Sequence, residues 1–273
     1  MPVTEPRYVR ILLISIAILS LTVLIILPIV YILVQAFSAG LGEYWNAISE
    51  EDTVNALKLT LFTAVICVVL NMIFGLSIGW ALGKFYVPGS RFIVGLIELP
   101  LSISPVIAGL VFILFLGKYS SIGSWFDEHG INIIFAVPGV VIATLFVTVP
   151  YIAREVIPLM HETGKDEEEA AMLLGAKGLR TFFSITLPKI KWGVIYGLLI
   201  TNARAIGEFG AVSVVSGHLR NKTTTLTLQI EMLYNEYNFT KSFAVASLLT
   251  SLAILTLLIK TWIEWKKTRR GQI

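Results

Sequence analysis

The chain has 273 residues, of which 56% are hydrophobic and 14% are charged, and its mean hydropathy is +0.81. These values lie outside the range of soluble globular domains and are typical of proteins with several membrane spans. The formal net charge is only +3, and the basic residues are spread over several loops, which disfavours nucleic-acid binding. The single cysteine, Cys67, falls inside an apolar run and has no partner for a disulfide within the chain.

Six apolar segments are long enough to cross a bilayer. A spanning helix needs about 20 residues, because the hydrocarbon core is about 30 Å thick and every backbone polar group must be hydrogen-bonded within it. The first segment follows two arginines, as a signal peptide would, but it is uncharged from Ile11 to Gly42 and is interpreted as a retained span. We predict an all-α polytopic membrane protein, with one transmembrane domain over residues 1–273. The predicted spans are Ile11–Phe37, Ala56–Leu82, Phe92–Leu116, Ile133–Met160, Trp192–Val215 and Phe243–Trp262.

The lysines and arginines predict how these spans are oriented, since cytoplasmic loops carry an excess of both. With six spans the termini share one side, and that side holds 15 basic residues against four on the other. The 15 are Arg7, Arg10, Lys84, Arg91, Arg154, Lys165, Lys177, Arg180, Lys189, Lys191, Lys260, Lys266, Lys267, Arg269 and Arg270, and the four are Lys118, Arg220, Lys222 and Lys241. We therefore expect both termini and the loop 161–190 in the cytoplasm, and the loop 216–242 outside.

Prolines and glycines interrupt spans three to five. A proline removes a backbone donor, and a glycine loosens packing, so bent helices are expected. Two interpretations stay open: these residues are simply commoner in membrane helices, or the kinks let the spans line and gate a path. The candidates for such kinks or gates are Pro100, Pro105, Gly207 and Gly210.

The loop between spans four and five has the features of two short helices. The acidic run Asp166–Glu169 suits a helix start, where the helix dipole favours negative charge, and Thr163 and Asp166 are candidate N-caps. Gly175 can adopt the left-handed conformation that ends a helix. A second short helix is expected to follow, and Leu187-Pro188 is expected to close the loop before the next span.

Seven residues of this loop have a specific spacing, namely Glu169, Ala170, Ala171, Gly175, Ile185, Leu187 and Pro188. The pattern resembles the EAA-x3-G-x9-I-x-LP loop of permease subunits of ATP-binding-cassette (ABC) importers, and every position is filled. The resemblance implies the six-helix type I importer (MetI-like) fold and a loop that docks on a separate ATPase subunit, with Glu169 and Gly175 most important to that contact. The alternative is an ordinary amphipathic loop that lies on the bilayer surface.

The chain lacks a Gly-x4-Gly-Lys-[Ser/Thr] phosphate loop, so we do not expect it to be an enzyme that hydrolyses ATP. Its three histidines show no spacing typical of metal ligands, and no cofactor is expected on this chain. By the resemblance, ATP and Mg²⁺ would bind an ATPase dimer. The other expected partners are a second permease subunit and an extracytoplasmic solute-binding protein.

The segment from Arg204 to Phe239 resembles the W-type permease subunits for sulfate and thiosulfate. Its Gly-Glu-Phe-Gly core also occurs in molybdate permeases, which look different after that core, and T-type sulfate subunits diverge there too. Asn221-Lys222 departs from the pattern at an expected loop tip. The resemblance implies an importer of sulfate or thiosulfate, with a T-type-like second permease subunit and an extracytoplasmic sulfate- or thiosulfate-binding protein as partners. A permease for another oxyanion such as molybdate or tungstate, and an anion transporter driven by an ion gradient, are the alternatives.

Arg204 and Glu208 stand one helical turn apart in an apolar span. An isolated charge at the centre of a span costs about 2.5–3.5 kcal/mol, so neither side chain is expected to face lipid. Two roles stay open: an ion pair that holds helices in register, or a guanidinium presented to a passing oxyanion. Ser213 and Ser216 complete the candidate substrate path.

Overall fold

The computed structural model describes residues 6–269, and the side chains of residues 6–266. Within this range the chain is helical and has no strand. Five helices are long and apolar enough to cross a membrane, and a bent pair supplies a sixth span if it counts as one. The predicted all-α polytopic class is therefore confirmed. Arg270 lies outside the described residues, as do the side chains of Lys267 and Arg269.

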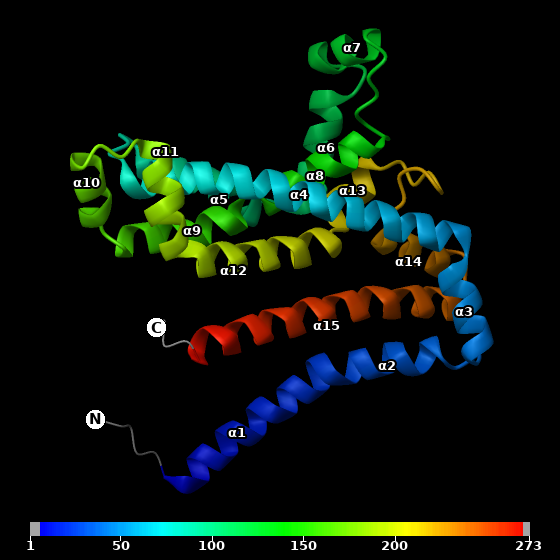
Figure 1. Ribbon diagram of the computed structural model, residues 1–273. Helices are drawn as coiled ribbons and strands as arrows, with labels where there is room; N and C mark the ends of the chain where they lie inside the picture. Colours follow the sequence, from blue (N-terminus) through cyan, green and yellow to red (C-terminus); the bar gives the residue numbers. More distant parts are fainter. Residues whose placement is uncertain (1–5, 270–273) are drawn as a thin grey trace.

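The first span lies along the edge of the molecule (Figure 1). It runs through α1 (Arg7–Leu21), the π-helical segment η1 (Thr22–Ile26) and α2 (Leu27–Ala36). The wider π turn ends two residues before Pro28, whose ring clashes with the preceding turn of a regular α-helix and which has no N–H to donate. The α2 part packs against α15 (Phe239–Arg269), whereas no residue of α1 is buried. Most of this span thus lacks a packing partner within the described chain.

The centre of the molecule is built from α4 (Glu51–Lys84), α8 (Val137–Thr148), α9 (Pro150–Glu162) and α12 (Leu187–Ile206). The helix of span four begins at Val137, four residues later than predicted, because Ile133–Ala136 form an irregular segment. Asn71 of α4 donates a buried hydrogen bond of 2.7 Å to Thr148 Oγ1 of α8. This bond fixes the rotation of α4 against α8 inside the bundle.

Glycines bring α4 and α9 close together. Gly75, Gly79 and Gly83 recur every fourth residue of α4, and they face Ile152, Val156 and Met160, which have the same spacing on α9. A Cβ on Gly79 would lie 2.7 Å from Val156 Cγ1, closer than side-chain carbons approach each other. Small residues at such interfaces maximise van der Waals packing, which matters in lipid because the solvent itself is apolar.

The third predicted span is sharply bent. α5 (Ser90–Ser102) and α6 (Pro105–Leu116) meet at 105°, and α6 leads away from the bundle to α7 (Ser121–Glu128) (Figure 1). Ser104 has an extended backbone, with φ −58° and ψ 130°, because a residue that precedes a proline disfavours the helical conformation. The sequence predicts one continuous span here, and the structure divides it at Ile103–Ser104.

The fifth predicted span differs at both ends. Its helix begins earlier, at Gly178, through α11 (Gly178–Thr181) and η2 (Phe182–Thr186), and α12 then ends at Ile206. After a break the chain continues as α13 (Gly210–Val215), which packs against α6 and α8. The two interrupted spans therefore meet at α6 and α13.

The bundle has two distinct ends (Figure 1). At one lie α10 (Asp166–Leu173), the start of α1 and the end of α15, and at the other lie α3 (Leu41–Ser49) and α14 (Leu226–Asn235). We call these the α10 end and the α14 end. Among the basic residues assigned to opposite sides, Lys165 and Lys177 flank α10, Arg220 and Lys222 precede α14, and Lys118 lies in the connection from α6 to α7.

Candidate functional site

The loop 161–190 presents its motif on the short helix α10. Gly175 ends this helix with φ +89°, a left-handed conformation that the missing Cβ allows. The backbone hydrogen bonds of the last turn close around it, since Ala176 N donates to Ala171 O at 3.0 Å. The left-handed glycine is where the sequence predicts it.

The start of α10 differs in one respect from the prediction. Four acidic residues fill its first turn, as expected, but the N-cap position is Lys165 and no side chain caps the helix. Thr163 instead ends α9, where its hydroxyl donates to Met160 O at 3.2 Å. The negative charges of the first turn thus interact favourably with the positive end of the helix dipole, and no hydroxyl caps the helix.

Most motif residues on α10 face away from their own chain. Glu169, Ala170 and Gly175 are exposed, and Ala171 is half-buried. Leu173 and Leu174 lie beside them with 90% and 91% of their surface exposed. Together with the exposed side chains of Met172, Leu179 and Phe183 they form an apolar surface at the α10 end. Large exposed apolar side chains concentrated in one segment are typical of a site of protein or membrane contact.

The second half of the motif lies in a continuous helix. Ile185 and Leu187 are half-buried and Pro188 is exposed, and all three fall between Gly178 and Ile206 without a turn. The expectation that Leu187-Pro188 closes the loop is wrong, because η2 widens the helix just before Pro188 and so accommodates the ring. Phe182 of η2 packs on Trp80 of α4, with 4.8 Å between the ring centres.

A buried ion pair joins α10 to the end of α4. Lys84 Nζ lies 3.0 Å from Glu168 Oε1, and Thr186 Oγ1 donates to the same oxygen at 2.8 Å. The ammonium also donates to Thr163 Oγ1 at 3.2 Å and to the carbonyl of Gly164. The sequence analysis did not single out this pair, because nothing in a run of four acidic residues distinguishes the buried one.

The predicted pair of charges in span five is present and bridges the break between α12 and α13. Arg204 NH1 lies 2.5 Å from Glu208 Oε2, with 29% of the arginine side chain and 1% of the glutamate side chain exposed. Glu208 Oε1 also accepts a 2.8 Å hydrogen bond from Ala211 N and so caps α13. Thr227 Oγ1 donates to the carbonyl of Glu208 at 2.8 Å. The interrupted backbone is thereby satisfied, as non-helical chain at membrane depth requires.

The other polar residues of the predicted path have local partners. Ser213 donates to Gly210 O at 2.9 Å, and the buried Ser216 hydroxyl accepts from His218 N at 3.1 Å. At the α14 end, Arg220 contacts Glu236 and lies 3.3 Å from Asp52. The hydrogen bond with Glu236, and then the charges of both carboxylates, raise the pKa of Arg220. Ser213 and Ser216 thus bond groups close to them in the sequence, whereas Arg204 and Glu208 bond each other.

The candidate kink residues lie at or near the two breaks. Pro100 is buried inside α5, and Pro105 begins α6. Gly207 ends α12, and Gly210 begins α13 against Pro105. The contact between Gly210 and Pro105 therefore places both interruptions in one region of the bundle.

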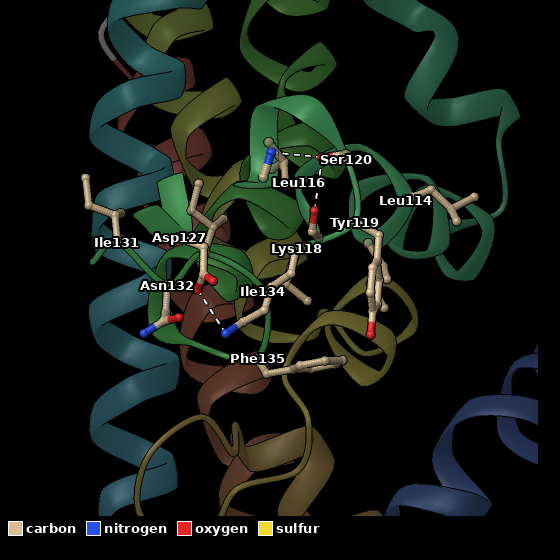
Figure 2. Close-up of a pocket in the computed structure, with 14 residues that line it drawn as sticks. Leu114, Leu116, Lys118, Tyr119, Ser120, Asp127, Ile131, Asn132, Ile134 and Phe135 are labelled. Atoms are coloured by element: carbon tan, nitrogen blue, oxygen red, sulfur yellow. Dashed lines mark hydrogen bonds and ion pairs between the residues drawn. The ribbon is translucent and has the colours of Figure 1, made fainter. Parts of the chain in front are cut away.

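A cavity of 410 Å³ lies under α7 (Figure 2). Lys118 and Asp127 form an ion pair of 2.9 Å beside it, and the Ser120 hydroxyl accepts from Gly123 N at 2.8 Å and caps α7. None of its lining residues belongs to the motif loop or to the Arg204–Glu208 pair. Among residues 6–269 no group of three or more His, Cys, Asp or Glu side chains is placed to hold a metal ion.

Residues 75–269 match the family described as "Binding-protein-dependent transport system inner membrane component". The sulfate transport system permease protein CysW of Escherichia coli K12 is 46% identical over 93% of this chain and 87% of that protein. The permease protein CysT of the same organism is 28% identical over 88% of this chain and 87% of its own length.

One solved structure is a bacterial alginate ABC transporter in complex with an alginate-pentasaccharide-bound periplasmic protein. It matches with a TM-score of 0.78 and 15% identity over 97% of this chain and 96% of its own, and so shows the shared fold. The chain therefore belongs to the family of binding-protein-dependent transport system inner membrane components, the membrane-spanning permease subunits of ABC importers.

Proposed function

We propose that this chain is the W-type permease subunit of an importer for sulfate and thiosulfate. The observation that carries this function is the 46% identity to CysW over nearly the whole chain, together with the filled EAA-like motif on an exposed helix. The chain is a transporter subunit and not an enzyme. A permease for molybdate or tungstate is the second candidate, since the Gly-Glu-Phe-Gly core occurs in both groups.

The orientation proposed here puts the α10 end in the cytoplasm and the α14 end outside. The excess of lysine and arginine on the side of α10 supports it. The loop that follows α13 would then face the extracytoplasmic binding protein, which delivers the anion.

Energy must come from another subunit. Importing a divalent anion against a potential of about 100 mV costs about 2 × 2.3 kcal/mol, and each tenfold accumulation adds about 1.4 kcal/mol. An ATPase dimer that binds ATP and Mg²⁺ is the proposed source. Closure of the dimer on ATP would draw the motif loops together, and hydrolysis would release them. The exposed apolar surface beside Glu169 and Gly175 supports docking at α10.

A second permease subunit of the T type is the proposed membrane partner. In α1, which has no buried residue, Ile11, Leu12, Leu13 and Leu19 each expose more than half of their surface. Packing of this arm on a neighbouring permease would give it the contacts that its own chain does not supply. Substrate would pass between the two permeases, near the two helix breaks that Pro105, Gly210 and Arg204 flank.

The test is uncoupling of ATP hydrolysis from transport. Glu169→Lys and Gly175→Asp are made in the complete importer, and uptake of radiolabelled sulfate and ATPase activity are measured with membrane abundance as control. Both variants are expected to reach the membrane and to lose uptake while ATPase activity continues. Unchanged sulfate uptake in a strain with both changes would refute the assignment of the loop.

The alternative energy source, an ion gradient, is tested by reconstitution. The chain alone in liposomes, given an ion gradient and labelled sulfate, is expected to accumulate none. Accumulation under these conditions would make it an ion-coupled transporter.

Competition of uptake by unlabelled thiosulfate but not molybdate is expected for the W-type function, and the reverse pattern would favour the second candidate.

A further inference from the structure

Helix α10 is tied to the membrane part of its own chain by one buried side chain. Of the eight residues of α10, Glu168 alone is buried. Its carboxylate meets Lys84, and the two side chains are 10% and 6% exposed. The adjacent carboxylates lie outside: Glu169 is exposed, and Glu167 forms a 2.8 Å pair with Lys189 while 66% exposed.

The Lys84 ammonium bonds both α10 and the turn that precedes it. Lys84 is the last residue of α4, and its positive charge suits the negative end of that helix. It bonds Thr163 and Gly164 in the turn before α10 as well as Glu168 within it. Through Glu168 the contact extends to Thr186, a 1% exposed residue of the helix that enters α12.

Such an arrangement specifies position more than stability. Removing two charges from water costs nearly as much as their attraction returns, so replacing a buried pair by apolar side chains is often neutral or stabilising. Several directed hydrogen bonds from one ammonium, however, define the distance and angle of the groups that accept them. The surrounding apolar contact of Phe182 with Trp80 has no comparable directionality.

We propose that Lys84 and Glu168 are positioning residues for energy coupling, which hold α10 rigidly on the end of α4. A displacement of α10 by the ATPase is then passed to α4, α9 and α12 as one body. Glu168 faces inward, which leaves the motif residue Glu169 free for the partner. This inference rests on the proposed function of the loop as the docking element.

The test uses the complete importer in lipid nanodiscs with Lys84→Met, Glu168→Leu and the double variant. Each single change leaves one buried charge unpaired, and we expect lower abundance. The double variant has an apolar pair, and we expect it to recover wild-type abundance. Sulfate transported per ATP hydrolysed, measured in proteoliposomes, is expected to stay at least about fivefold below wild type, within the range of coupling between sites.

Lys189→Met is the matched control, because it removes the more exposed Lys–Glu pair of the same loop, and its transport per ATP is expected to equal that of wild type. A double variant that inserts but no longer binds the ATPase also supports the proposal, since α10 is then misplaced. Wild-type transport per ATP in the double variant would overturn it. If Glu169→Lys still uncouples transport in that case, the docking function of the loop stands and only the positioning role fails.

Discussion

Gly210 lies directly against Pro105, so that a Cβ on Gly210 would stand 3.0 Å from Pro105 Cβ. These residues begin the second halves of two different interrupted spans, α13 and α6. One turn further along α6 the contact continues, since a Cβ on Gly109 would lie 2.7 Å from the carbonyl oxygen of Ala211, the residue after Gly210. The two breaks are therefore packed on each other, and a change of angle at one requires a change at the other.

The first prediction concerns this contact. Gly210→Ala adds one methyl group at a spacing that a small shift relieves, whereas Gly210→Val forces the two helices apart, at a typical cost of about 1–3 kcal/mol. We expect near-normal sulfate uptake for the first and a loss of about tenfold for the second, since 1.4 kcal/mol corresponds to that factor.

The measurement is uptake divided by membrane abundance. Gly95→Val in α5 is the control, because a Cβ at Gly95 meets no atom within 4 Å, and it should leave uptake unchanged. Normal uptake in Gly210→Val would show that transport does not depend on the close contact between the two breaks.

The second prediction separates the two roles of Arg204. Arg204→Gln leaves the buried Glu208 carboxylate without its cation, and loss of one partner of a buried pair costs about 3–5 kcal/mol. Abundance is expected to fall. Adding Glu208→Gln removes the unpaired charge and keeps an oxygen that accepts from Ala211 N, so the double variant should return to normal abundance.

Uptake by that double variant then decides the function of the guanidinium. We expect it to stay about tenfold below wild type, because Arg204 keeps an exposed side from which it can attract an oxyanion in a low-dielectric path. Normal uptake at normal abundance would leave Arg204 with a structural role alone.

The third prediction concerns the left-handed Gly175. Its φ of +89° strains any other residue, and a Cβ there meets no atom of the chain within 4 Å. Asparagine tolerates a left-handed backbone better than alanine does, for which this conformation costs about 1–2 kcal/mol. If the backbone limits coupling, Gly175→Asn should retain more sulfate transport per ATP than Gly175→Ala. The opposite order would mean that the ATPase surface leaves no room for a side chain, since asparagine is the larger residue.

Sequence patterns predicted the parts of this protein that depend on local chemistry. Hydropathy located the spans, because a bilayer of fixed thickness demands a minimum apolar length, and the fold class and family agree with that analysis. The end of α10 followed from one glycine, since few other residues adopt its φ. The start of the helix that contains Pro188 was not predicted. Leu187-Pro188 was expected to close the loop before that helix, but the π turn η2 accommodates the proline within it.

Contacts between distant segments were beyond these patterns. The inward orientation of Glu168 depends on its ion pair with Lys84 at the end of α4. Lys84 lies 84 positions earlier in the sequence, and no local pattern describes a contact over that separation. The 105° bend likewise needed the packing of α6 on α13 to fix its size, although Pro105 indicated its place. Periodic glycines in α4 were visible in the sequence, but their partners on α9 were not.

The last prediction tests those glycines. Gly79→Leu places a large side chain where a Cβ already comes within 2.7 Å of Val156 Cγ1, and overpacking of this kind is expected to cost at least about 1–3 kcal/mol. The purified subunit should unfold at lower temperature in detergent, and its abundance should fall. Gly79→Ala combined with Val156→Ala removes the clashing methyl groups and should unfold close to the wild-type temperature, whereas Gly79→Ala alone should not. Because apolar side chains gain little by leaving lipid, this interface depends on close packing, and equal unfolding temperatures for all three variants would contradict the glycine contact.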